Sequence, residues 1–179
     1  CLIPALVFAL VSPISANPYQ IEISKSQRLL SLRHGDEIHK VYRISSGRGG
    51  PGDKERLGDN KTPIGTYQVI GFNEKSKFDF FIHLNYPNVE DASRGLKEQT
   101  ITAAEFDEIV GAVRRDEPPP QDTALGGAIG IHGIGVETSE KLHIHTNINW
   151  TEGCIAVRNN EIQELRQNVK IGTKVVITE

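Results

Sequence analysis

Residues 149–157 read Asn-Trp-Thr-Glu-Gly-Cys-Ile-Ala-Val, and they lie downstream of an Ile-His-Gly segment at residues 131–133. The chain has two cysteines, Cys154 in the first of these stretches and Cys1 at the start. Exported proteins usually oxidise their thiols in pairs. Because the N-terminal segment has the features of an export signal, an unpaired Cys154 with His132 upstream indicates a cysteine kept for chemistry.

The first 16 residues are expected to be a signal-peptide remnant. Residues 2–11 form an uncharged apolar run, and residues 12–16 end in Ser-Ala, as at a secretory cleavage site. We therefore expect residues 17–179 to form one catalytic domain, exported to the periplasm of a Gram-negative bacterium. The apolar run is short for a bilayer, so we expect no membrane span in the mature chain. A lipidated Cys1 is the alternative, although an apolar run follows it directly.

The composition of the chain argues against a nucleic-acid partner. The chain of 179 residues is long enough for one domain with a sizeable core. Its net charge is −3, and its 20 Lys and Arg residues are scattered along the sequence. A nucleic-acid partner is therefore not expected, because nucleic-acid-binding surfaces are strongly basic.

The patterning predicts an α+β domain that is mostly β, with short helices at its periphery. Alternating apolar residues predict an antiparallel meander, a long Gly- and Pro-rich loop follows at 47–65, and later strands are expected at 65–72, 79–84, 126–131 and 173–178. One helix is expected from Thr102, whose capping box includes Glu105, and a second starts near residue 159 and ends at residue 172. His143 and His145 alternate with apolar residues, so on a strand both would point to one face.

Cys154 and His132 form the candidate catalytic pair. A thiol attacks a carbonyl as its thiolate, so it needs a base beside it or a lowered pKa. His132, at the end of a predicted strand, is the candidate general base. Gly133 can leave its carbonyl free to orient the imidazole, and the backbone N–H groups of Gly153 and Cys154 could stabilise an oxyanion.

These segments resemble a known family. The Ile-His-Gly segment and NWTEGCIAVRNNEI at 149–162, with GDNKTPIGTYQV at 58–69 and LNYPN at 84–88, are similar to the L,D-transpeptidase catalytic (YkuD) family. The resemblance covers nearly all of the expected mature chain. It implies a YkuD-like β-sandwich or barrel, a Cys154 nucleophile, a His132 base and acid oriented by the Gly133 carbonyl, no metal or organic cofactor, and peptidoglycan stem peptides as partners.

The cysteine motif departs from the common family pattern. Many members have Ser-His before Gly-Cys and an arginine two residues after the cysteine, whereas this chain has Thr151, Glu152 and Ala156. An acidic residue before Gly-Cys resembles the YafK-like branch. Such enzymes attach or release a peptidoglycan-anchored lipoprotein, which is therefore a further candidate partner. An unpaired Glu152 would raise the thiol pKa, so we expect it to turn toward Arg158, another cation or water.

Five residues are candidates for substrate binding, and each has a structural alternative. Tyr86 and Asn88 could line the cleft or simply form a turn, and Trp150 could be a pocket wall or a core aromatic. Arg158 and Asn159 could contact a stem-peptide carboxylate, while Asn159 or Asn160 could instead cap a helix.

The functional prediction is a transferase with open alternatives. The expected reaction forms a thioester between Cys154 and a stem tetrapeptide and transfers the acyl group to an amine. A hydrolase that releases the lipoprotein or cleaves stem peptides is the alternative on the same fold. A silent peptidoglycan-binding module, or a zinc site of Cys154 with three histidines (His132, His143 and His145), are alternatives from other classes.

Overall fold

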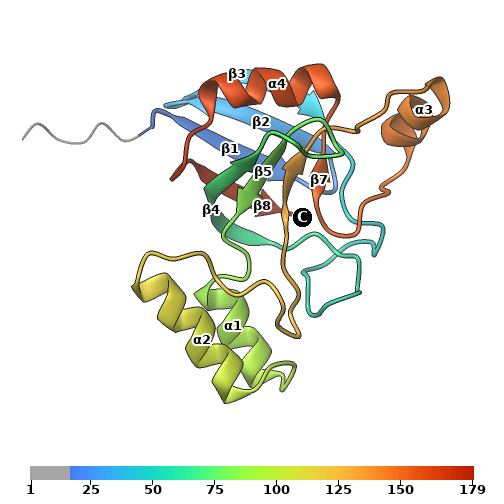
Figure 1. Cartoon of the computed structure of the whole chain (residues 1–179). Coiled ribbons are helices and arrows are strands. Elements are labelled where there is room, and N and C mark those ends of the chain that lie inside the picture. The colour runs from blue at the N-terminus through green and yellow to red at the C-terminus, as the bar shows by residue number, and fades with distance from the viewer. Residues whose placement is uncertain (1–16) are drawn as a thin grey trace, which may run out of the picture.

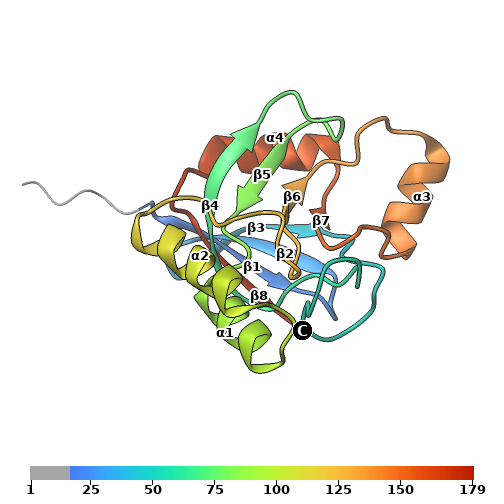
Figure 2. The same ribbon diagram turned by 60° about the horizontal axis from the view of Figure 1, so that its bottom comes forward.

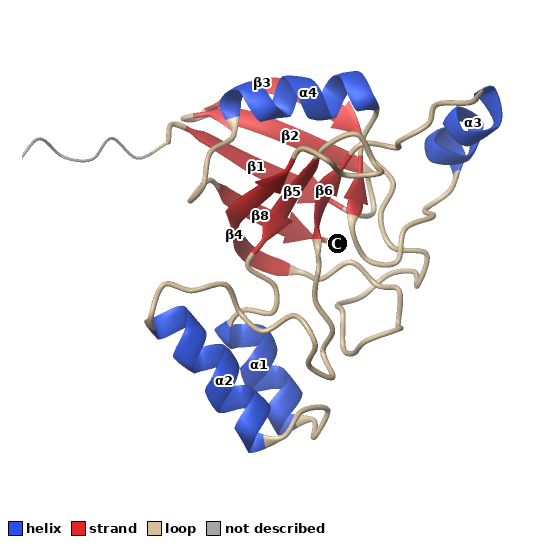
Figure 3. Cartoon of the chain, viewed as in Figure 1, coloured by secondary structure: helices blue, strands red, loops and turns tan. Residues whose placement is uncertain are grey.

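The computed structural model describes residues 17–179, so the expected signal at residues 1–16 lies outside the described residues. One curled sheet dominates the fold, with short helices around it (Figures 1 and 3). Its strands are β1 (Tyr19–Ser24), β2 (Leu29–His34), β3 (Glu37–Arg43), β4 (Gly65–Asn73), β5 (Phe81–Leu84), β6 (Gly130–His132), β7 (Ile155–Ala156) and β8 (Lys174–Thr178). The helices are α1 (Val89–Lys97), α2 (Ala103–Arg114), α3 (Ser139–Asn147) and α4 (Asn159–Asn168). The predicted fold class is confirmed. No helix within residues 17–179 is long and apolar enough to cross a bilayer.

The strand order in the sheet is β3-β2-β1-β8-β4-β5-β6-β7. The predicted antiparallel meander is confirmed as β1, β2 and β3. Strand β8 pairs parallel to β1 and antiparallel to β4, and it thereby joins the meander to the second half of the sheet. Strands β6 and β7 pair in parallel at the far edge.

The two outer strands of the sheet are brought together by the segment that follows β3. The Ser45 N–H donates to the Ala156 carbonyl at 3.0 Å, and the Ala156 N–H donates back to Ser45 at 2.8 Å. A further bridge joins Gly47 to Thr151. These contacts explain the curled, half-barrel form visible when the molecule is turned (Figure 2).

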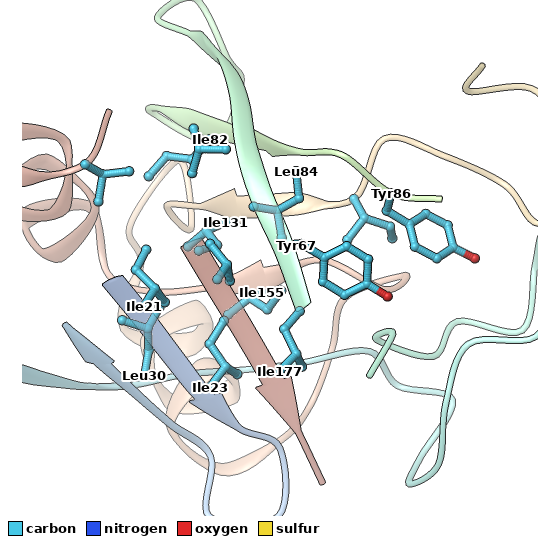
Figure 4. Packing of buried hydrophobic residues seen from close by; sticks show 14 of the residues in the cluster. Ile21, Ile23, Leu30, Tyr67, Ile82, Leu84, Tyr86, Ile131, Ile155 and Ile177 are labelled. Carbon is cyan, nitrogen blue, oxygen red and sulfur yellow. The ribbon is translucent and has the colours of Figure 1, made fainter. Parts of the chain in front are cut away.

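The core fills the inside of this curl. Side chains alternate along β1, where Ile21 and Ile23 are buried and their neighbours are only partly so, as period-two patterning requires. Apolar residues from most strands meet there, as Figure 4 shows: Ile21, Ile23, Leu30, Ile82, Leu84, Ile131, Ile155 and Ile177. The core thus fixes β6 and β7, the strands that border the candidate site.

Two helices form where capping chemistry predicts or permits them. The predicted capping box of α2 is confirmed, because the Glu105 N–H donates to Thr102 Oγ1 and the Thr102 N–H donates to the Glu105 carboxylate. Helix α1 was not predicted. Its capping box uses Asn88 and Asp91 in the same reciprocal way. The two helices pack against each other below the sheet, away from α4 (Figure 1).

Two expectations about local structure are wrong. The predicted strand at 126–131 is reduced to β6, because residues 126–129 form a loop in which Ala128 has a φ of +53°. His143 and His145 lie on helix α3, which begins where Thr138 Oγ1 accepts the Lys141 N–H. They do not share a face, since His143 is exposed and His145 is buried.

Helix α4 begins one residue earlier than a cap at Asn159 would require, and two residues earlier than a cap at Asn160 would require. The N-cap is Arg158, whose N–H donates to the Glu161 carboxylate at 2.8 Å, and Asn159 is the first helical residue. The helix ends at Asn168, before the expected end at residue 172. The Asn159 side chain is therefore not the helix cap and is available for other contacts.

Candidate active site

His132 and Cys154 are brought to one place by the parallel pairing of β6 with β7. In this register Ile131 lies opposite Ile155 and His132 opposite Ala156, so Cys154, which directly precedes β7, lies beside the start of β6, and His132 is at the end of that short strand. Both side chains line one cavity of about 380 Å³. Its other walls come from Arg48, Lys77, Phe78, Trp150, Thr151 and Glu152. A substrate in this cavity would have both groups within reach.

The ring of His132 is held in one orientation and one tautomer. Its Nδ1 lies 2.6 Å from the carbonyl oxygen of Gly133. A carbonyl only accepts, so Nδ1 carries the proton and Nε2 is left as the basic nitrogen. The ring stacks on Phe78 at 4.2 Å between centroids and meets the edge of Trp150 at 6.0 Å. Burial lowers the His132 pKa to about 4, so the imidazole is neutral at pH 7.

The loop that follows His132 is fixed by the side chain of Asn159. Its Oδ1 accepts the N–H groups of Ile134 at 2.9 Å and Gly135 at 3.1 Å, and its Nδ2 donates to the Gly135 carbonyl at 2.6 Å. Gly133 is required in this loop, since a Cβ there would lie 2.5 Å from the Phe78 carbonyl oxygen and 2.6 Å from Asn159 Oδ1. Asn159 therefore positions the histidine loop, where we expected a substrate contact.

Cys154 carries a protonated thiol in the free protein. Its Sγ lies 3.3 Å from the Ala128 carbonyl oxygen, which the thiol donates to. Burial raises the Cys154 pKa to about 11, although part of the side chain is exposed to solvent. The raised thiol pKa and the lowered imidazole pKa both favour a neutral pair over a thiolate–imidazolium ion pair.

The turn before Cys154 is organised by Thr151. Its hydroxyl donates to the Cys154 carbonyl at 2.6 Å and accepts the Gly153 N–H at 3.2 Å. Gly153 has a φ of +135°, and a Cβ there would lie 2.9 Å from the Lys61 carbonyl oxygen. The Gly153 N–H, predicted as an oxyanion donor, is thus already bonded to Thr151. The position still requires glycine, for backbone conformation and for space.

A second cavity, of about 250 Å³, meets the first at Cys154 and Glu152. It is lined mainly by the 126–129 loop together with Lys54, Leu57, Gly58 and Asn60. Lys54 is buried, and its Nζ donates to Asp59 at 2.7 Å and to the Arg56 carbonyl at 2.9 Å. Four N–H groups converge on the Asp59 carboxylate, counting those of residues 55, 56 and 61. Cys154 therefore lies where the two cavities meet.

Glu152 pairs with a cation, as expected, but the cation is Arg48 and not Arg158. The two side chains form an exposed ion pair at 3.3 Å. Arg158 is exposed at the start of α4 and lines neither cavity among the described residues. A contact between Arg158 and a substrate carboxylate has no support from its position.

Of the other predicted substrate residues, only Trp150 lines a cavity beside the thiol. Tyr86 has no exposed surface, and its hydroxyl donates to the Leu125 carbonyl at 3.0 Å. Asn88 caps α1 by accepting the Asp91 N–H at 2.9 Å. The cleft-lining interpretation of Tyr86 and Asn88 is therefore replaced by a structural one, because their polar atoms are occupied away from the thiol.

Several site residues were not predicted from the sequence. Arg48, Lys54, Lys77 and Phe78 come from loops that carry no periodic signal. The sequence offered one indication of these residues, because Glu152 was expected to pair with a cation. That cation is Arg48. As for metals, no cluster of three or more His, Cys, Asp or Glu side chains arranged to hold an ion occurs within residues 17–179.

Comparison with known proteins agrees with this geometry. The sequence model of the family described as YkuD, L,D-transpeptidase catalytic domain, matches residues 18–177. A curated relative, the putative L,D-transpeptidase YafK of Escherichia coli K12, is 33% identical over 88 residues, which cover 46% of this chain and 36% of the relative. This match supports the YafK-like branch.

Solved structures share the fold. Bd1075 of Bdellovibrio bacteriovorus has a TM-score of 0.55 and Pgp2 of Campylobacter jejuni, a helical cell shape determining protein, has 0.58, each at 23% identity. Each alignment covers 92% of this chain and 49% of the other. An L,D-transpeptidase from Xylanimonas cellulosilytica has a TM-score of 0.52 at 16% identity, over 93% of this chain and 63% of that one. The chain thus spans about half of the first two structures and about a third of the curated relative.

Proposed function

The chain belongs to the L,D-transpeptidase catalytic domain (YkuD) family, and on this premise we propose that it is a peptidoglycan L,D-transpeptidase working through a Cys154 thioester. The observation behind the proposal is that Cys154 lines one cavity with His132, whose Nδ1 is held by the Gly133 carbonyl. The substrate would be a stem tetrapeptide, and the acyl acceptor an amine of the cell wall or of a wall-anchored lipoprotein. Such a substrate implies an exported, periplasmic location.

The first half of the reaction forms the thioester. His132 Nε2 accepts the Sγ proton as sulfur attacks the carbonyl carbon at the L-centre of the third stem residue. The imidazolium then returns that proton to the departing amine as the carbon–nitrogen bond breaks. Because both groups are neutral at rest, proton transfer accompanies attack and does not precede it.

The second half reverses these roles. An acceptor amine loses its proton to His132 Nε2 as it attacks the thioester, and the thiol regains a proton when the carbon–sulfur bond breaks. Water in place of the amine gives hydrolysis. In either case the Gly133 carbonyl keeps the imidazole in the required tautomer and stabilises its protonated form.

The oxyanion donor in this mechanism is the Cys154 N–H. The Gly153 N–H already donates to Thr151, while the Thr151 hydroxyl holds the backbone on the C-terminal side of Cys154 by donating to the Cys154 carbonyl. A fixed backbone N–H beside the nucleophile is the usual way to stabilise a tetrahedral oxyanion.

The test is to incubate the purified protein with a defined tetrapeptide muropeptide, with and without an amine acceptor. We expect an acyl adduct on Cys154 by intact-mass spectrometry and an exchanged product when the acceptor is present. Only shortened products would identify a hydrolase. Cys154→Ala should abolish both adduct and turnover, and retention of all function by that variant would instead identify a binding module.

A further inference from the structure

The two cavities that meet at Cys154 differ in their access to the base. His132 lines the first cavity, together with Phe78 and Trp150, and is absent from the walls of the second within the described residues. In the proposed mechanism His132 protonates the leaving amine and deprotonates the incoming one. By this symmetry both amines must lie on the His132 side, so the acyl chain extends toward the second cavity.

The first cavity is also the more cationic one. Arg48 and Lys77 both line it, and its one acidic wall residue, Glu152, is paired with Arg48. Lys77 has no acidic partner within 4.0 Å among the described residues. By contrast Lys54, the cation of the second cavity, is neutralised by Asp59 at 2.7 Å.

Lys77 lies near the His132 ring, because both contact the Phe78 ring. Its Nζ lies 5.0 Å from the centroid of the Phe78 ring, and that ring stacks on His132 at 4.2 Å. A cation over an aromatic face is retained there by attraction to the ring electrons. The ammonium therefore borders the space that the leaving amine and the acceptor amine would occupy.

We infer that Lys77 is a specificity-determining residue that recognises a carboxylate attached next to the reacting amine. The inference rests on the proposed function and deepens it by naming the chemical class on the amine side. That class is an α-amino acid unit, whose amine and carboxylate share one carbon. An amine at the end of a neutral alkyl chain has no group for Lys77 to bind.

Acylation alone can test this, because it requires no acceptor and occurs in both transfer and hydrolysis. Two tetrapeptides that differ only in their last group would be compared, one ending in D-alanine and the other in D-alaninamide. The measured quantity is the ratio of their second-order rates of Cys154 acylation, followed by intact-mass spectrometry. The different leaving abilities of the two amines cancel when this ratio is compared between variants.

We expect Lys77→Gln to reduce the acid-to-amide ratio by about fivefold, the size typical of an exposed charge pair. Lys77→Glu should reduce it further, and added salt should reduce it in the unmodified protein. Lys75→Gln is the matched control, since Lys75 is exposed on the same turn but does not line the cavity, and it should leave the ratio unchanged.

The outcomes separate the two claims. Adducts that form with an unchanged ratio in both Lys77 variants would overturn the assignment of Lys77 while leaving the proposed function intact. Equal loss of both peptides would show a general effect on the site and would also overturn it. Failure of both peptides to acylate the unmodified protein would remove the proposed function itself.

Discussion

The Nδ1 atom of His132 lies 2.6 Å from the carbonyl oxygen of Gly133, its neighbour in the chain. A bond between adjacent residues is possible only if the backbone turns sharply after β6, and the contacts around Gly133 show what holds that turn. The orientation of the base therefore depends on residues that would not themselves touch substrate.

Gly133→Ala should lower kcat/KM for thioester formation by about a hundredfold, the cost of displacing a reacting group by roughly 1 Å. The added Cβ would collide with the Phe78 carbonyl oxygen and Asn159 Oδ1, so the loop must move. Gly71→Ala is the control, because a Cβ at that position meets nothing within 4 Å. Equal activity of the two variants would contradict a positioning role for Gly133.

Asn159→Leu should lower the free energy of unfolding by about 2 kcal/mol, since two backbone N–H groups and one carbonyl lose their partner. Activity should fall further than stability explains, because the histidine loop loses its anchor. Urea unfolding and acylation rates measure the two effects. Asn160→Leu, at an exposed neighbouring position, should change neither.

The reactivity of Cys154 should rise with pH well beyond neutrality. With a raised thiol pKa of about 11, the thiolate fraction grows about tenfold for each pH unit between 7 and 10. Alkylation by iodoacetamide, followed by mass spectrometry, should show this slope. A rate that is already constant from pH 6 upward would mean that a thiolate–imidazolium pair exists at rest.

The protein should lose stability as pH falls from about 6.5 to about 4. Burial lowers the pKa of both His132 and His145 from the ordinary value of about 6.5 to about 4. In this window the unfolded chain binds protons that the folded one does not, so the free energy of unfolding falls as pH decreases. Urea midpoints across this range measure the effect. His145→Gln should flatten the dependence, whereas His143→Gln, an exposed change on the same helix, should not.

Asp59→Ala should destabilise the protein by about 3–5 kcal/mol, because it leaves the buried ammonium of Lys54 without its partner. It also removes the acceptor for three N–H groups of the loop beside the second cavity. The double variant Asp59→Ala with Lys54→Met should recover part of that loss in thermal unfolding. No recovery would mean that the backbone contacts, and not the buried charge, dominate.

Long elements with clear patterning were predictable from the sequence. The alternation in β1 and β2 and the capping box of α2 are local signals, and the structure follows them. The helix α3 was misread because histidines at 143 and 145 flank a single isoleucine, a spacing that mimics strand alternation. The Thr138 cap and the helical backbone hydrogen bonds outweigh that short pattern.

The candidate site was predictable where it depends on residue type and not where it depends on loops. Cys154 and His132 stand out by their chemistry. Lys77, Phe78 and Arg48 reach the cavity through turns whose course depends on tertiary contacts. Asn159 was predicted to contact substrate, whereas its side chain binds loop partners more than 20 residues away, and no local pattern indicates them.

The placement of β8 between β1 and β4 has a consequence for biogenesis. Until residues 174–178 are present, β1 and β4 lack the strand that pairs with both of them, and each exposes an unpaired edge. A chain that stops before residue 174 would expose two unpaired strand edges. Such edges can pair with other chains and lead to aggregation or proteolysis. Joining the two halves of the sheet therefore depends on a strand that follows both Cys154 and His132 in the sequence.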